Sequence, residues 1–145
     1  MSYAVAAALQ EAVYQRLAGD AALNALVAGA IYDALPGGPL PDTYVTLGPE
    51  EARARGDATG EGAWHRLTVS VVTTATGFHG AKQVAAAISD ALEPGGLSLS
   101  RGRLAGLHFY RARARREGTG AVRRIDLTFR ARVDDTDKPL NNRRM

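Results

Sequence analysis

The residues with the clearest chemical potential in this sequence are its arginines. Residues 101–133 contain ten arginines, and Glu117 and Asp126 are the only acids among them. Residues 1–62 have the opposite balance, with eight acids against three arginines. Because guanidinium groups bind phosphate and carboxylate oxygens, this distribution predicts a basic surface suited to nucleic acid or to an acidic protein partner. A GC-rich coding sequence would also enrich a chain in arginine, alanine and glycine.

The basic surface is expected to be one face of a β-sheet, since strand side chains alternate between the two faces. The arginines predicted on that face are Arg66, Arg111, Arg113, Arg124, Arg130 and Arg132. Like charges opposite each other in a hairpin are unfavourable unless anions lie nearby. DNA phosphates or acids of another subunit would supply them, and the acids predicted for this role are Asp42, Glu50, Glu51, Asp57 and Glu61. The alternative is a solvated face that Asp126 partly neutralises.

Aromatic side chains are not expected among these arginines. Interleaved aromatic residues are typical of surfaces that bind single strands or read bases. Passive contact with a DNA backbone is therefore predicted in preference to recognition of a sequence. Trp64, at the start of a predicted strand, is interpreted as a core or interface anchor.

Patterns that would support catalysis, cofactor binding or metal binding are absent from the sequence. It has no cysteine, no G-x-x-x-x-G-K-[ST] motif and no G-x-S-x-G motif. His65, His79 and His108 form no metal-binding pair on a helix, and the adjacent Glu50 and Glu51 are interpreted as solvated loop charges. We therefore predict that the protein is not an enzyme and has no catalytic residue, cofactor or metal site.

Three helices and a short strand are predicted to accompany these charges. Apolar residues recur at helical spacing over residues 5–17, and Gly19 is placed to end this helix. Asp20 is expected to cap a shorter helix, and Ile31–Tyr32 is predicted to be a short strand. The same helical spacing recurs over residues 80–92, before a Pro-Gly-Gly stop at 94–96.

Longer strands are predicted at residues 44–47, 63–75, 107–116 and 121–133. Residues 63–75 alternate well, and the stretch from Gly48 to Gly62 before them is charged and glycine-rich, which favours a long mobile loop. The last two strands are joined by residues 117–120 and predict a hairpin. Pairing Arg116 with Ala121 predicts the core pairs Tyr110/Leu127 and Ala112/Ile125, and the opposite-face pairs Arg111/Asp126 and Arg113/Arg124.

These elements predict an α+β fold: an antiparallel β-sheet of about four strands with two main helices packed on one face. A single domain is expected over residues 1–135, followed by a flexible C-terminal tail over residues 136–145. No apolar run is long enough to span a membrane, and no signal peptide is recognised. Synthesis in the cytoplasm is therefore expected.

The order of several segments resembles the tail-completion, or tail-terminator, proteins of long-tailed phages. The first helix leads into Ala28-Gly29-Ala30-Ile31-Tyr32, and Pro41-Asp42-Thr43-Tyr44-Val45-Thr46-Leu47-Gly48 fits the pattern P-x-x-Y-V-x-L-G of that family. The strand from Trp64 to Thr73 then precedes a helix, as in the family. The resemblance covers about residues 3 to 133, and the composition is similar to the version encoded by alphaproteobacterial gene transfer agents.

The resemblance implies a structural protein that works without catalysis or cofactor. It would form a homohexameric ring on the last ring of tail-tube subunits, at the tail–neck junction of a phage-like particle. The ring would stop tube polymerisation and dock to the head-completion or stopper protein, and DNA would pass through its channel. The alternatives are another neck component such as a head–tail stopper, a small nucleic-acid-binding α+β module, and an enzyme with unrecognised acid–base residues.

Overall fold

The computed structural model of the chain describes residues 3–54 and 62–135. The helices are α1 (Ala6–Ala18), α2 (Ala21–Val27) and α3 (His79–Leu92). The strands are β1 (Ile31–Tyr32), β2 (Thr43–Ala54), β3 (Gly62–Thr73), β4 (Arg103–Glu117) and β5 (Val122–Asp134). None of the described helices is long and apolar enough to cross a membrane.

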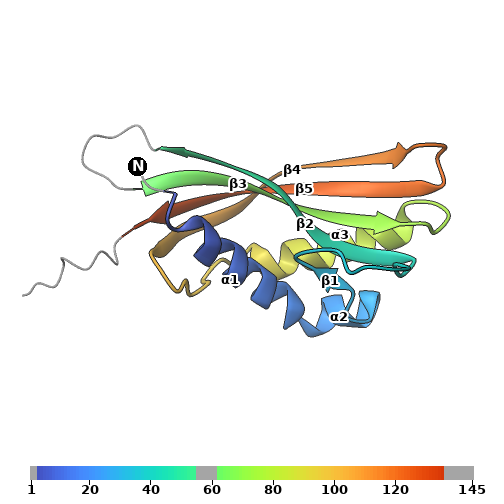
Figure 1. Cartoon of the computed structure of the whole chain (residues 1–145), viewed down its shortest axis with the longest axis horizontal. Helices are drawn as coiled ribbons and strands as arrows, with labels where there is room; N and C mark the ends of the chain where they lie inside the picture. The colour runs from blue at the N-terminus through green and yellow to red at the C-terminus, as the bar shows by residue number, and fades with distance from the viewer. Residues whose placement is uncertain (1–2, 55–61, 136–145) are drawn as a thin grey trace, which may run out of the picture.

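The strands form one sheet in the order β1-β2-β3-β5-β4, and the helices lie on one side of it (Figure 1). β2, β3, β5 and β4 are antiparallel to their neighbours, whereas the two-residue β1 runs parallel to β2. The predicted α+β class is confirmed. The sheet has five strands instead of about four, because β1 pairs with Val45 and Thr46 at its edge.

The helix boundaries follow local capping chemistry. Gly19 follows the last residue of α1, and its N–H donates to the Gln15 carbonyl oxygen. The Asp20 carboxylate accepts a hydrogen bond of 2.9 Å from the Leu23 N–H, which caps α2 as predicted. Residues 80–92 form α3 with one additional residue, His79, at its start.

The prediction of a long loop from Gly48 to Gly62 is wrong at both ends. Residues 48–54 continue β2, and Gly62 already belongs to β3. A bulge between Leu47 and Glu50 accommodates Gly48 and Pro49, and a side chain at Gly48 would lie 3.3 Å from Thr68 Cβ. Glu50, Glu51 and Arg53, which are part of the charge that indicated a loop, occupy an edge strand, where both faces tolerate polar side chains.

The hairpin of β4 and β5 exists, but its register differs from the predicted one by two residues near the turn. The pairs there are Arg116/Arg123, Ala114/Ile125 and Arg113/Asp126, instead of the predicted Arg116/Ala121, Ala112/Ile125 and Arg111/Asp126. Because the shift is even, the arginines after residue 110 keep their predicted face. Arg124 therefore faces Arg115 and not Arg113.

Tyr110, in contrast, does not lie on the face of the sheet predicted for it. A bulge between Phe109 and Arg111 leaves Tyr110 without a partner on β5. Phe109 lies opposite the fully buried Phe129, and their rings meet edge to face at 6.0 Å. Tyr110 turns to the other face, where it contacts arginines, so its predicted place beside Leu127 in the core is wrong.

The hydrophobic core lies between the helices and one face of the sheet. Its largest fully buried side chains include Phe129 and Leu107 from the hairpin, Leu9 and Leu17 from α1, and Ile88 from α3. The opposite face of β2, β3, β5 and β4 receives no described helix. We call it the open face.

Candidate functional site

The open face collects arginines from all four long strands. Side chains opposite one another on neighbouring strands point to the same side, so the cross-strand pairs identify its members. All six arginines of the predicted basic face lie here, together with Arg53 of β2 and Arg115 of β4: Arg53, Arg66, Arg111, Arg113, Arg115, Arg124, Arg130 and Arg132. Their chemical surroundings divide the face into two halves.

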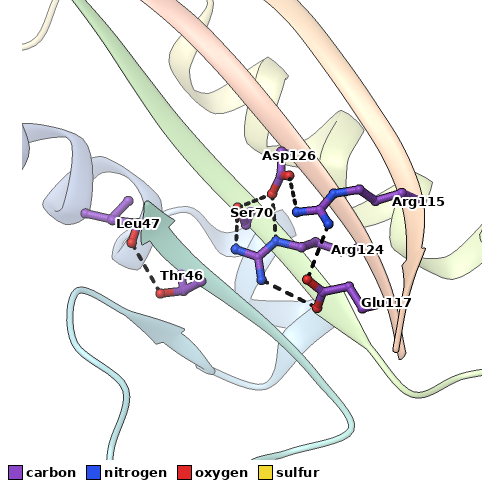
Figure 2. A network of polar contacts seen from close by, with 7 residues as sticks. All are labelled: Thr46, Leu47, Ser70, Arg115, Glu117, Arg124 and Asp126. Atoms are coloured by element: carbon purple, nitrogen blue, oxygen red, sulfur yellow. Dashed lines mark hydrogen bonds and ion pairs between the residues drawn. The ribbon is translucent and has the colours of Figure 1, made fainter. Parts of the chain in front are cut away.

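The half nearer the β4–β5 turn is neutralised by acids of the same chain (Figure 2). Asp126 accepts hydrogen bonds from Arg124 Nε at 2.8 Å, Ser70 Oγ at 2.6 Å and Arg115 Nη2 at 3.2 Å. Glu117 lies 3.4 Å from Arg115 and 3.9 Å from Arg124. The two facing arginines are thus bridged by two carboxylates, and no external anion is needed at this point.

The carboxyl group of Asp126 is held in its ionised form by this network. Partial burial opposes ionisation, but the hydrogen bonds from Ser70 and Arg124, the Arg124 charge and the Arg115 hydrogen bond together lower its pKa below 3.8. A carboxyl group with a lowered folded-state pKa stabilises the fold above its unfolded pKa, and this contribution is lost as the pH falls through the folded value.

We predict that Asp126→Asn lowers the free energy of unfolding by about 1–3 kcal/mol at neutral pH, because Arg115 and Arg124 then face each other with one carboxylate fewer. The difference in the free energy of unfolding between wild type and variant should decrease as the pH falls below 3.8. Urea unfolding of both proteins, from neutral pH to below 3.8, measures this difference. A difference that stays constant with pH would contradict the proposed charge effect.

The other half of the open face contains an arginine–aromatic cluster: Trp64, Arg66, Tyr110, Arg130 and Arg132. Arg66 and Arg130 lie 4.8 and 5.4 Å from the Tyr110 ring centre, and Arg130 lies 4.8 Å from that of Trp64. Arg132 also contacts Trp64, at 5.9 Å. The expectation that aromatic residues are lacking among these arginines is therefore wrong. The rings contact the facing Arg66 and Arg130 and stabilise them by cation–π attraction.

Several guanidinium groups of the open face remain without a close anion among the described residues. Among the described residues, Arg53, Arg111 and Arg113 form no ion pair, and Arg66 approaches Glu51 only to 4.0 Å. Two hollows of about 230 and 250 Å³ flank Arg66, one beside Trp64 and the other beside Tyr110 and Arg111. The arrangement presents fixed cations and ring faces to an anionic surface.

The predicted acidic partner residues do not gather in one place. Glu51 lies on the open face beside Arg66, whereas the neighbouring Glu50 points to the helix side. Asp42 precedes β2 at its other end. Asp57 and Glu61, like the predicted C-terminal tail, lie outside the described residues. Glu50 and Glu51 are strand residues, so their interpretation as loop charges is wrong.

Glu50 instead joins the N-terminal segment to the sheet. Its carboxylate accepts a hydrogen bond of 2.6 Å from Tyr3 and lies 2.7 Å from Nδ1 of the fully buried His65. The hydrogen bond to this carboxylate, its negative charge and slight desolvation raise the pKa of Tyr3. The contact with Glu50 gives the buried His65 a polar partner, which indicates a structural role for this histidine.

Residue spacing carried a signal for only part of this site. Arg115 alternates with Arg111 and Arg113, so its place on the open face follows from the same pattern that predicted them. The bridging role of Glu117 depends on the register at the turn, and that of Tyr110 depends on the bulge. Neither feature has a sequence signature as clear as alternation.

Comparison with known proteins assigns the chain to a family. The family described as Tail completion protein gp17 matches residues 11–134. A search of curated protein sequences gives no match. A chain in the solved structure of the virion of a native gene transfer agent (GTA) particle is 60% identical and superposes with a TM-score of 0.88, over 92% of this chain and 99% of that one. The resemblance read from the sequence is thus confirmed, and the chain belongs to the tail completion protein gp17 family.

Proposed function

We propose that this protein is the tail terminator of a phage-like particle, a ring that closes the tail tube at its head-proximal end. The ring, a homohexamer, stops polymerisation of the tail tube protein and docks to the head-completion or stopper protein. DNA passes through its channel. The protein acts as a structural part of the tail, without catalysis, cofactor or contact with a membrane.

The observation that carries this proposal is the family match over residues 11–134 together with the virion chain at 60% identity. Membership of a tail completion family makes the chain a structural protein of a phage-like tail. Because the related chain was solved within a virion of a gene transfer agent, we assign this chain to the same kind of particle. Its position at the tail–neck junction is part of the proposal.

The open face is the surface that we assign to contacts in the ring. Its cations without an anion, Arg53, Arg111 and Arg113, and the arginine–aromatic cluster would meet an acidic neighbour or face the DNA channel. Since Asp126 and Glu117 neutralise Arg115 and Arg124, the remaining arginines of the open face are the ones expected to attract an external anion.

A second candidate function is nucleic-acid binding by the isolated protein. The stacking of Arg66 and Arg130 on Tyr110 favours it, because aromatic rings among cations are typical of single-strand-binding surfaces. Binding of a single-stranded oligonucleotide by the monomer with a steep dependence on salt would support this function. A terminator needs no such affinity, since DNA must slide past it.

The test is electron microscopy of particles from a strain that lacks this protein. We expect overlong tails or heads without joined tails, because tube growth and head joining both lose their control. Complementation with the wild-type chain should restore particles of normal length. Normal tails on complete particles in the deletion strain would reject the terminator function.

A further inference from the structure

The sheet ends in two edges that no described strand covers. At one end of the strand order, β4 has β5 on one side only. At the other end, β1 pairs only with Val45 and Thr46, so residues 48–54 of β2 have β3 on one side and no described strand on the other. An uncovered strand presents backbone N–H and C=O groups with which another strand can pair.

The surroundings of the two edges carry opposite charge. The charged residues of β4 are mostly basic: Arg103, Arg111, Arg113, Arg115, Arg116 and the single acid Glu117. The free part of β2 contains the acids Glu50 and Glu51 and the single base Arg53, and the Glu51 side chain is 63% exposed on the open face. On the helix side of this edge, a hollow of about 620 Å³ between α1 and β2 is lined by Glu11, Asp33 and Glu50.

Pairing of β4 with β4 of a second copy is therefore disfavoured, because it would bring arginines against arginines. Pairing of β4 with the β2 edge brings arginines to carboxylates instead. These are two different surfaces, so the contact is heterologous, and a heterologous contact repeated by rotation closes into a ring.

We propose that β4 of each copy pairs with residues 48–54 of β2 in the next copy, so that the sheet continues from subunit to subunit. This inference rests on the ring of the proposed function and names its interface. β2 and β5 run in the same direction and β4 runs in the opposite one. A neighbour in the same orientation therefore adds β2 antiparallel to β4, which extends the alternation already present.

The cross-strand pairs within one chain indicate the register between β4 of one copy and β2 of the next. Glu50, Leu67, Phe129 and Phe109 form one row across the sheet. Extending this row brings Phe109 of one copy against Glu50 of the next on the helix side. The adjacent row brings His108 against Glu51 on the open face, with Arg111 diagonal to Glu51 and within reach of a long side chain. Phe109, which is 42% exposed in the single chain, then lies inside the contact.

Cysteine cross-linking in purified particles tests this interface, since the chain contains no cysteine of its own. Glu51→Cys on the open face of β2 is combined in one chain with His108→Cys, Arg111→Cys or Arg113→Cys on the same face of β4. These three positions cover the neighbouring registers, because residues on one face recur every second position apart from the one additional residue at the bulge. The matched control combines Glu51→Cys with Ala112→Cys, which lies on the same strand but points to the other face.

We expect oxidation to give a ladder of linked subunits with at least one open-face position and none with Ala112→Cys. Monomers from all three combinations, in particles with normal tails that contain the protein, would overturn the pairing and leave the terminator function intact. Equal ladders from Ala112→Cys would overturn it as well. A deletion strain with normal tails would instead overturn the proposed function.

Hydrogen exchange on wild-type particles provides a measurement that needs no variant. The amides of residues 48–54 on the free side of β2 should exchange at least about tenfold more slowly in particles than in the isolated chain, because pairing protects them from solvent. Equal exchange rates in the two states would overturn the pairing even if the cysteine variants failed to assemble.

Discussion

A chain in which Arg111 and Arg113 are both replaced by glutamate is expected to fold normally and to fail in particle assembly. Neither arginine forms an ion pair among the described residues, and both side chains lie on exposed positions of β4. Reversal of their charge therefore breaks no ion pair of the described part of the chain. The repulsion between a carboxylate at position 113 and Asp126, its cross-strand partner, should cost less than about 1 kcal/mol at this exposed position. The reversal does place two negative charges where the proposed ring brings an acidic neighbour.

The expected fall in complete particles is about a hundredfold or more, since like charges brought together at an interface cost several kcal/mol. Electron microscopy counts the heads joined to tails, and circular dichroism with urea unfolding checks the fold. Arg124 is unsuitable for this test, although it belongs to the same predicted face, because its reversal would break the network around Asp126.

Two control variants separate the site from general charge effects. Replacement of Arg111 and Arg113 by lysine keeps the charge and should keep most of the particles. Lys82→Glu on the exposed side of α3 reverses a charge away from the open face and should have little effect. Normal particle numbers from the double glutamate variant would reject a role of Arg111 and Arg113 in assembly.

The largest loss of stability is expected from Phe129→Ala. Phe129 is fully buried between the sheet and the helices, and its replacement leaves a cavity at the centre of β5. The free energy of unfolding should fall by about 3–5 kcal/mol. This is a large part of the total for a domain of this size, which is about 5–15 kcal/mol.

Phe109 provides the matched control for this variant. It is the same residue type, faces Phe129 directly and touches its ring, but is 42% exposed. Phe109→Ala should therefore cost only about 1 kcal/mol in the isolated chain, because most of the ring is not buried there. Urea unfolding of both variants measures the difference. Similar losses would show that the edge of the sheet is as well packed as its centre.

The sequence predicts well those features that depend on short-range patterns. The helices are predictable because Gly19 and Asp20 mark a helix end and a helix start, and because apolar residues recur at helical spacing. The two-layer α+β class followed from the order of these segments. The face of Arg111 and Arg113 followed from alternation, which survives an even shift in register.

The features that the sequence did not predict depend on contacts between distant residues. Gly48 and Pro49 look like a loop, yet the long β3 provides a partner for the strand that continues after them. The neutralisation of Arg124 depends on Ser70 and Asp126, which are distant in the chain and adjacent in the sheet. Tertiary pairing overrode the local signal in both cases.

The bulge at Tyr110 has a genetic consequence. Phe109 and Arg111 already point to opposite faces, as consecutive strand residues do, so Tyr110 is the one additional residue between them. Deleting its single codon would make β4 a regular strand, and all the remaining side chains of β4 would keep their present faces. The same deletion would remove the ring that Arg66 and Arg130 share. Relatives that differ by one residue in length at this position would therefore keep the fold and lose the aromatic centre of its basic surface.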